Sequence, residues 1–281
     1  MSIKLLLQYI VPQRLFSKLL GFCANHRIPF VSRPYTKYFL RRYEVNMQEA
    51  VHEKLDEYKT FNALFTRHLK PGLRPIEGDE HTLVSPVDGT LSEFGPIKQG
   101  ELIQAKGIDY SLLALLAGDK SLAETFVDGD FATFYLSPRD YHRVHMPLSA
   151  TLKAVHYVPG KLFSVSPLTT ENISGLFVKN ERAIFVFETA VGPMVLIMVG
   201  AIIVSSICTV WSGKLKSTRL MRDDLSAKSI RLARGEEMGH FELGSTVIVL
   251  TPKNVIRWCD NLKTGQPIKL GNKLGETLRN H

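Results

Sequence analysis

The sequence predicts an α+β fold, in which a β-rich body follows an N-terminal helical region. In the first 43 residues, apolar side chains recur with the spacing of an α-helix. From about residue 82 onward, short apolar runs alternate with turn residues, as expected for strands. The chain has 281 residues, of which 44% are hydrophobic and 22% charged, so it can bury a full core. We therefore expect a helical region over residues 1–70 and a β-rich body over residues 71–281.

The excess positive charge of the protein lies at its N-terminus. Residues 1–43 contain eight Lys and Arg, and the first acidic residue is Glu44. These bases equal the whole net charge of +8, so the remaining residues are neutral overall. A nucleic-acid partner is not expected, because it would require a basic surface on the body. Near an anionic membrane, each base can contribute about 1 kcal/mol to binding.

Two amphipathic helices are predicted within this basic segment. Helical spacing predicts the first from Ile3, Leu6, Leu7 and Ile10. Pro12 can begin the second helix and Gly21 can end it. Its apolar stripe consists of Leu15, Phe16, Leu19 and Leu20. Helices with bases opposite Leu and Phe typically lie in a membrane interface, and the alternative is packing on the body with solvated bases. A secretory signal is not expected, because Pro12 interrupts the apolar run.

The remaining elements follow from apolar spacing and turn residues. Residues 44–70 are expected to be helical, with Thr60 as a helix cap, and Ser111–Ala117 is predicted as a further helix capped by Ser111. Predicted strands cover Thr82–Val84, Gly89–Phe94, Phe131–Leu136, Ala150–Tyr157, Ala183–Glu188 and Thr246–Leu250. Residues 214–237 are polar and of mixed charge, which favours a loop or an exposed helix before the final strand.

The uncharged segment from Thr189 to Gly213 is long enough to span a bilayer. However, Gly192-Pro193 and Gly200 interrupt it, and β-branched residues dominate its composition. We therefore predict two buried strands, Val195–Val199 and Ile202–Trp211, rather than a spanning helix.

Three segments contain groups suited to catalysis, although each also has a purely structural interpretation. Asp88 in Val84–Gly89 is suited to a turn, as Asp-Gly pairs usually are. His142 and His145 suit proton transfer near neutral pH, but can equally be structural. Gly244-Ser245 stands before a β-branched run, where a tight turn is ordinary. No metal site is expected, because the sequence shows no further Cys or His cluster near the histidine pair.

The cysteines add no further chemistry to these segments. Cys23, Cys208 and Cys259 are odd in number and far apart, so they form neither a disulfide framework nor a CxxC motif. Reduced thiols are therefore expected.

Taken together, the three segments and their flanks carry a family resemblance. The matching motifs are Thr60-Phe61-Asn62, Arg74-Pro75-Ile76, Pro86–Gly89, Gln104–Gly107, Leu136–Pro147, Tyr157–Gly160, Leu162–Val165, Asn180–Arg182, Val210-Trp211 and Leu243–Thr246. The chain closely resembles the membrane-associated, pyruvoyl-dependent phosphatidylserine decarboxylases of proteobacteria. The most specific match combines YHRVHMP with LGST, and the resemblance extends from the N-terminal helices to near the C-terminus.

The resemblance implies a self-processing enzyme. The Ser245 hydroxyl would attack the Gly244 carbonyl, and the chain would break between them into a large chain (1–244) and a small chain (245–281). Residue 245 would become a pyruvoyl group that forms a Schiff base with phosphatidylserine. Pyridoxal phosphate is the usual alternative electron sink, but the sequence shows no recognisable phosphate-binding loop and no anchoring Lys for it. The products would be phosphatidylethanolamine and CO₂.

The resemblance also assigns residues, partners and location. His145 would be the base that activates Ser245, oriented by Asp88, and His142 would act near the pyruvoyl group. The two chains would form a heterodimer that can dimerise further, on the cytoplasmic face of the bacterial inner membrane as a peripheral protein. Two other functions stay open on the residues alone. One is an interfacial hydrolase that uses Ser245, His145 and Asp88 without self-cleavage, and the other is a non-enzymatic membrane adaptor.

Overall fold

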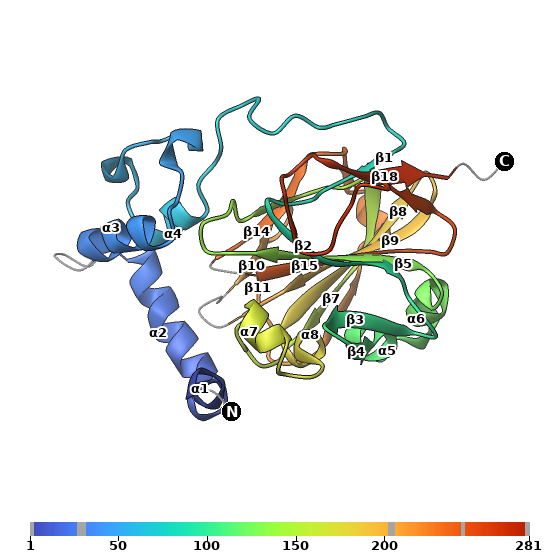
Figure 1. Cartoon of the computed structure of the whole chain (residues 1–281), viewed down its shortest axis with the longest axis horizontal. Coiled ribbons are helices and arrows are strands. Elements are labelled where there is room, and N and C mark those ends of the chain that lie inside the picture. The colour runs from blue at the N-terminus through green and yellow to red at the C-terminus, as the bar shows by residue number, and fades with distance from the viewer. Residues whose placement is uncertain (1–2, 27–31, 202–205, 243–244, 279–281) are drawn as a thin grey trace.

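The computed structural model describes residues 3–26, 32–201, 206–242 and 245–278. Helices and strands are both present and strands predominate, which confirms the predicted α+β class. Figure 1 shows the N-terminal helices on one side of the molecule and the strands gathered on the other. Below, residues 3–26 and 32–42 are called the arm, and residues 71–278 the body.

The arm consists of three helices, α1 (Ile3–Ile10), α2 (Gln13–Asn25) and α3 (Ser32–Arg42). Both predicted helices are confirmed, and α2 begins directly after Pro12. The predicted end of α2 at Gly21 is wrong. The helix continues to Asn25, whose side-chain amide donates a hydrogen bond to the Gly21 carbonyl at 2.9 Å. The apolar spacing did not indicate α3.

The arm contacts the body and leaves apolar side chains open to solvent. The Gln8 and Gln13 side chains accept hydrogen bonds from the backbone N–H groups of Ser164 and Leu162. On the outer side of α2, Leu15 is 68% exposed and Leu19 is 61% exposed. Within the described part of the chain, no helix is both long and apolar enough to cross a membrane.

The predicted helix over residues 44–70 is wrong except near its end. Its first part forms two 3-10 turns, η1 (Met47–Glu49) and η2 (Leu55–Glu57). The Val51 N–H donates to the His68 carbonyl, and an antiparallel bridge joins the two segments. These long-range hydrogen bonds use backbone groups that a continuous helix would have paired locally.

The short helix α4 (Phe61–Phe65) is the part of this prediction that holds. Thr60 caps it as predicted, since its hydroxyl accepts a hydrogen bond from the Ala63 N–H at 3.1 Å. The Asn62 side chain donates to the Asn25 side chain of α2 at 3.1 Å. Helix α4 therefore connects the arm to the body.

A large antiparallel sheet forms most of the body. Its strand order is β12-β7-β8-β9-β15-β5-β2-β17, and β13 pairs with β7 outside this path. The strands are β2 (Gly89–Pro96), β5 (Asp130–Leu136), β7 (Ala150–Val158), β8 (Arg182–Thr189), β9 (Gly192–Val199), β12 (Met221–Asp224), β13 (Arg231–Leu232), β15 (Ser245–Thr251) and β17 (Gln266–Ile268). The strands predicted at these positions are confirmed. The core lies along β8, β9, β15 and β5, where Phe185, Ile197, Ile248 and Phe134 are fully buried.

Smaller sheets complete the body. One has the order β11-β10-β14-β6, with β6 (Arg143–His145), β10 (Ile207–Thr209), β11 (Gly213–Leu215) and β14 (Glu237–Phe241). Another has the order β1-β18-β16, with β1 (Thr82–Val84), β16 (Ile256–Trp258) and β18 (Lys273–Thr277). A hairpin pairs β3 (Glu101–Ala105) with β4 (Ile108–Ser111). The helices of the body are α5 (Leu112–Leu115), α6 (Lys120–Phe126), α7 (Pro167–Thr170) and α8 (Leu176–Lys179).

Several predictions for the body need correction. Residues 214–237 were predicted as a loop or an exposed helix, and most of them do lie in loops and in the 3-10 turn η3 (Ser226–Lys228), but the prediction missed short strands with exposed polar faces, such as β12. β15 is not the final strand, since β16, β17 and β18 follow it. The predicted strand Ile202–Trp211 is shorter, covering Ile207–Thr209, and residues 202–205 lie outside the described residues. Ser111 caps α5 as predicted, through a hydrogen bond from the Ala114 N–H.

Candidate active site

Backbone pairing between two short strands positions the predicted histidines. In the β6–β14 pair, His145 lies opposite Glu237. His142 precedes β6, and its carbonyl accepts a hydrogen bond from the Phe241 N–H at 3.1 Å. His145 is therefore held beside the start of β14 and His142 beside its end, which is two residues before the segment that contains Gly244.

His142 is completely buried and has one defined tautomer. Its Nδ1 lies 2.9 Å from the Asp140 carbonyl oxygen, which can only accept, so Nδ1 bears the proton. Its Nε2 is buried and has no hydrogen-bond partner within the described residues. The Phe65 ring packs against the imidazole, with ring centroids 3.9 Å apart. Burial, followed by the nearby Arg67 charge, lowers the pKa of His142 to about 3, so it is neutral at pH 7.

His145 has a partner at each ring nitrogen. Its Nδ1 donates to the Gly235 carbonyl at 2.9 Å, so its Nε2 accepts from the Tyr141 hydroxyl at 3.1 Å. Gly235 presents this carbonyl with φ of +79°, a conformation that favours glycine. Burial lowers the pKa of His145, which keeps this imidazole neutral and its Nε2 free of a proton.

Asp88 is buried in a cluster of positive charges. Its carboxylate accepts hydrogen bonds from Arg74, from the Leu270 N–H at 2.9 Å and from Lys269 at 3.2 Å. Burial alone would raise the pKa of Asp88, but these hydrogen bonds and charges outweigh it and lower the pKa. The two ring nitrogens of His145 bind Gly235 and Tyr141 rather than this carboxylate, so Asp88 acts on His145 through its charge.

The predicted cleavage position lies at the start of a central strand. Ser245 is the first residue of β15, opposite Leu136 of β5. Gly244 lies outside the described residues, as does the hydroxyl of Ser245. On the other side of this position, the Glu242 N–H donates to the Ser206 carbonyl at 3.0 Å. Phe241 and Glu242 are therefore held by the backbone of His142 and Ser206, and Ser245 begins a strand in the middle of the large sheet.

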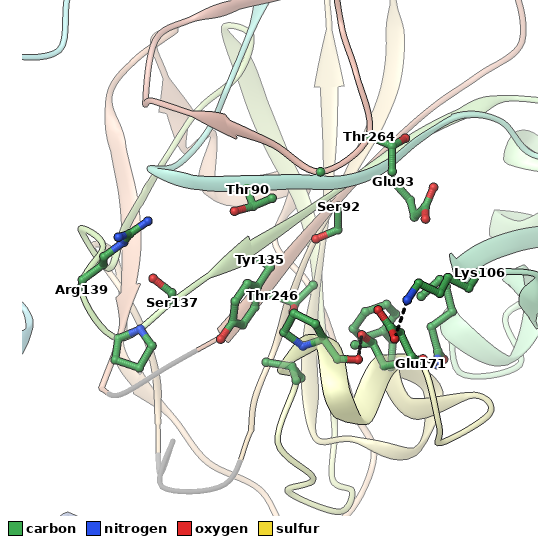
Figure 2. A pocket seen from close by; sticks show the side chains of 18 of the residues that line it. Thr90, Ser92, Glu93, Lys106, Tyr135, Ser137, Arg139, Glu171, Thr246 and Thr264 are labelled. Carbon is green, nitrogen blue, oxygen red and sulfur yellow. Dashed lines mark hydrogen bonds and ion pairs between the residues drawn. The ribbon is translucent and has the colours of Figure 1, made fainter. Parts of the chain in front are cut away.

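A cavity of about 780 Å³ adjoins this position. Figure 2 shows Thr246, Tyr135 and Ser137 around it, with Arg139 on one side and the Lys106–Glu171 ion pair on the other. Arg42, the last residue of the arm, and Tyr43, which directly follows it, also line this cavity. A headgroup with both positive and negative charges can be accommodated between these side chains.

Sequence analysis missed several residues of this arrangement. Arg74 and Tyr141 lie within motifs that were recognised. Arg74 is close in sequence to Asp88 and Tyr141 is close to His145, and this closeness could have indicated that they interact. Arg67 and Gly235 lie outside these motifs, and long-range folding alone brings them to the histidines. Within the described residues, no group of three or more His, Cys, Asp or Glu is arranged to hold a metal ion.

Comparison with known proteins identifies the family. A family model described as phosphatidylserine decarboxylase matches residues 61–276, and a second one, described as PSD, matches residues 3–44. A phosphatidylserine decarboxylase proenzyme of Hahella chejuensis is 46% identical over 277 residues, which cover 98% of this chain and 94% of that protein. The proenzyme of Vibrio cholerae is 49% identical over 276 residues, covering 96% of this chain and 97% of that protein.

The chain belongs to the phosphatidylserine decarboxylase family. The predicted family and the prediction of an enzyme are thereby confirmed. The relatives are named as proenzymes, that is, as precursors of the active enzyme.

The site of this family member can be tested against the pyruvoyl group implied by the resemblance. Such a group at residue 245 would stand at the start of β15, beside the cavity that Thr246 lines. Three buried polar atoms near this position have no hydrogen-bond partner within the described residues, namely His142 Nε2, Ser206 Oγ and Thr246 Oγ1. Buried polar atoms without partners are costly in a finished fold, so a polar group at residue 245 that reached any of them would be stabilised there. The residues therefore fit the group.

Proposed function

We propose that the chain decarboxylates phosphatidylserine to phosphatidylethanolamine and CO₂, using a pyruvoyl group made from its own Ser245. The observation that carries this proposal is the position of residue 245. It begins a central strand at the edge of a cavity and follows a segment held against His142. The names of the relatives support the substrate.

The first reaction is cleavage of the Gly244–Ser245 bond. The Ser245 hydroxyl oxygen attacks the Gly244 carbonyl carbon, the amide bond breaks and an ester forms, while the hydroxyl proton passes through a base to the amide nitrogen. Elimination then releases residues 1–244 as a carboxylate and leaves an unsaturated residue 245. Addition of water and loss of ammonia convert that residue to a pyruvoyl group.

We assign the base of this reaction to His145, as the resemblance implies. Support comes from its neutral imidazole and from the proton on Nδ1, which leaves Nε2 as the basic atom. Tyr141 must release Nε2 before it can accept a proton from Ser245. The Asp88 charge favours the protonated imidazole, although Arg74 and Lys269 reduce its effect.

When present, the pyruvoyl ketone supplies the electron sink that decarboxylation of an amino acid requires. The chain's own residues bind and orient the substrate in the cavity lined by Tyr135, Ser137 and Thr246. We assign to His142 the proton transfer near the substrate Cα, because its Nε2 carries no proton and has no partner within the described residues.

The pairing of strands supports a stable heterodimer of the two fragments. The small chain would contain β15, which pairs with β5 on one side and β9 on the other. It would also contain β17, which pairs with β2, and β18, which pairs with β1. These backbone hydrogen bonds and the buried side chains of β15 would keep residues 245–281 attached after cleavage.

We further propose that the protein is peripheral, on the cytoplasmic face of the inner membrane, with residues 1–70 as a membrane-association region and residues 71–281 as the catalytic domain. The exposed Leu15 and Leu19 on α2 support this proposal. So does the net charge of +8 within residues 1–43, since phosphatidylserine membranes are anionic.

Intact mass and activity measured on the same preparation test the function. Purified wild-type protein is expected to give a fragment 1–244 and a ketone-capped fragment 245–281, and to release CO₂ from phosphatidylserine in detergent. Ser245→Ala is the control, and is expected to stay intact and inactive. An unbroken wild-type chain that decarboxylates at full rate would overturn the proposal. An unbroken chain that a fluorophosphonate labels at Ser245 would instead support the interfacial hydrolase.

A further inference from the structure

Helix α4 and the loop before β6 hold each other through reciprocal hydrogen bonds. The Arg67 guanidinium, just after α4, donates through Nη2 to the carbonyl of Arg139 at 3.0 Å and, more weakly, to that of Asp140 at 3.5 Å. In the opposite direction, Arg143 donates through Nε and Nη2 to the Thr66 carbonyl at 2.9 and 2.7 Å. These contacts join segments more than 70 residues apart and hold the end of α4 against the residues around His142.

The imidazole of His142 lies inside this contact. Its Nδ1–H and the Arg67 Nη2 share the Asp140 carbonyl as acceptor, and the Phe65 ring covers one side of it. Arg67 is 4% exposed, and its Nε and Nη1 have no hydrogen-bond partners among the described residues. An arginine buried with donors unsatisfied is costly for stability. A role at the site would account for this cost.

We propose that Arg67 is a positioning residue for His142, which holds the Asp140 carbonyl in place so that His142 keeps its proton on Nδ1 and presents a free Nε2. This inference rests on the proposed function, which gives His142 its role in catalysis. The contacts between Arg67, Asp140 and His142 do not depend on that function. Two further effects follow from the same arrangement. The positive charge of Arg67 opposes protonation of His142, whereas the charge of Asp88 and the Asp140 carbonyl favour it. Because α4 also contacts α2 of the arm, the arm and the histidine are connected through it.

Histidine NMR on the uncleaved full-length chain tests the proposal. With the Ser245→Ala background and ¹⁵N-labelled histidine, the ring nitrogen shifts report the tautomer and the pKa of His142, which His142→Gln assigns. The background is expected to show Nδ1–H alone. Arg67→Met is expected to introduce the Nε2–H tautomer and to raise the pKa of His142 by about 1 pH unit, as loss of a nearby like charge does. Arg67→Lys should keep the low pKa and lose part of the tautomer preference.

Arg182→Met is the matched control. Arg182 is also buried, and its guanidinium likewise donates to backbone carbonyls, those of Ala114, Leu115 and Val178, at α5 and α8. Its loss is expected to lower stability without changing the His142 spectrum. If Arg67→Met leaves tautomer and pKa unchanged, or if both variants change them equally, the proposal is wrong. Should Arg67→Met not fold, Arg67→Lys decides, because an unchanged tautomer there contradicts the proposal.

The readout separates this inference from the proposed function. Ser245→Ala cannot make a pyruvoyl group, so the His142 spectrum does not depend on cleavage or decarboxylation. If wild-type protein stays uncleaved, the proposed function fails while the spectrum can still support the role of Arg67. If wild-type protein is active and the spectrum does not respond, only the role of Arg67 fails.

Discussion

The Asp88 carboxylate forms a buried ion pair with the Arg74 guanidinium, through Nε–Oδ1 at 2.9 Å and Nη2–Oδ2 at 2.6 Å. The same guanidinium also binds Glu49, in the segment that leads from the arm. Asp88 thus belongs to an ion cluster that connects β2 with the region before α4, and it influences the histidines electrostatically rather than through a direct hydrogen bond.

Breaking this ion pair is expected to destabilise the protein. Arg74→Met leaves a buried carboxylate with Lys269 and the Leu270 N–H as its remaining partners, and removal of one partner of a buried pair costs about 3–5 kcal/mol. Chemical denaturation in the Ser245→Ala background measures the free energy of unfolding. Arg257→Met is the control, because its pair with Glu276 is exposed and contributes about 1 kcal/mol or less. Equal losses in both variants would contradict the buried pair.

The neutral state of His142 predicts a pH dependence of stability. Its folded pKa of about 3 is below the ordinary value of 6.5, so between these values the unfolded chain binds the extra proton. The stabilisation is complete above about pH 6.5 and is lost as the pH falls toward 3. From pH 6.5 to 5, the chain should lose about 2 kcal/mol more than His142→Gln, measured by denaturation in the Ser245→Ala background. Parallel curves for the two proteins would show that His142 is not held neutral.

The two histidines are expected to fail at different steps. His145→Ala should accumulate the uncleaved chain on a denaturing gel, because the hydroxyl of Ser245 loses its base. His142→Ala should still cleave, but should reduce phosphatidylserine decarboxylation by about 10²–10⁴-fold through loss of proton transfer. His156→Ala is the control, since His156 lies on β7 and outside this site. Cleavage that stops in His142→Ala and proceeds in His145→Ala would reverse the assignment.

The exposed leucines of α2 are expected to matter on membranes and not in detergent. The double variant Leu15→Ser, Leu19→Ser should bind vesicles containing phosphatidylserine more weakly by at least about 100-fold, since burial of each leucine contributes about 1.5–3 kcal/mol. Cosedimentation with vesicles measures this binding. Val210→Ser with Leu220→Ser is the matched control, because these apolar side chains are exposed on the body. A similar loss in both pairs would count against docking through α2.

Removal of the whole arm tests the same role at larger scale. A chain without residues 1–43 should still cleave itself, because the residues assigned to cleavage all lie in the body. Its activity on bilayers should fall more than its activity on a short-chain substrate in detergent, because docking concentrates the enzyme on its lipid. Decarboxylation rates on the two substrates check this, with full-length protein as the reference. Equal losses on both would indicate that the arm acts on the site itself.

Local patterns predicted the elements whose stability is local. The spacing of Ile3, Leu6 and Ile10 predicted α1, and the hydroxyls of Thr60 and Ser111 predicted two helix caps. Strands such as β5 and β15 were recognisable because nearly every residue in them is apolar or β-branched, as expected for strands in the middle of a sheet. Elements whose stability depends on residues close in sequence can be predicted without knowledge of the rest of the chain.

Elements that depend on distant partners were not predicted. Residues 44–70 have helical spacing, but the backbone of Val51 pairs with that of His68 instead. The polar strand β12 was taken as a loop or helix because its partner, β7, supplies the hydrogen bonds that make it a strand. In both places, backbone groups gain more from a distant partner than from the local structure that the side chains favoured.

By itself, the sequence determined the family, the residues at which chemistry is expected and the basic character of the arm. Only the tertiary structure decided how these residues are partnered. Asp88 pairs with Arg74, and His145 forms hydrogen bonds with Gly235 and Tyr141. His142 donates to a carbonyl that also accepts from Arg67. The physical reason is that a residue type fixes which hydrogen bonds a side chain can make, whereas burial next to a distant segment decides which of them it does make.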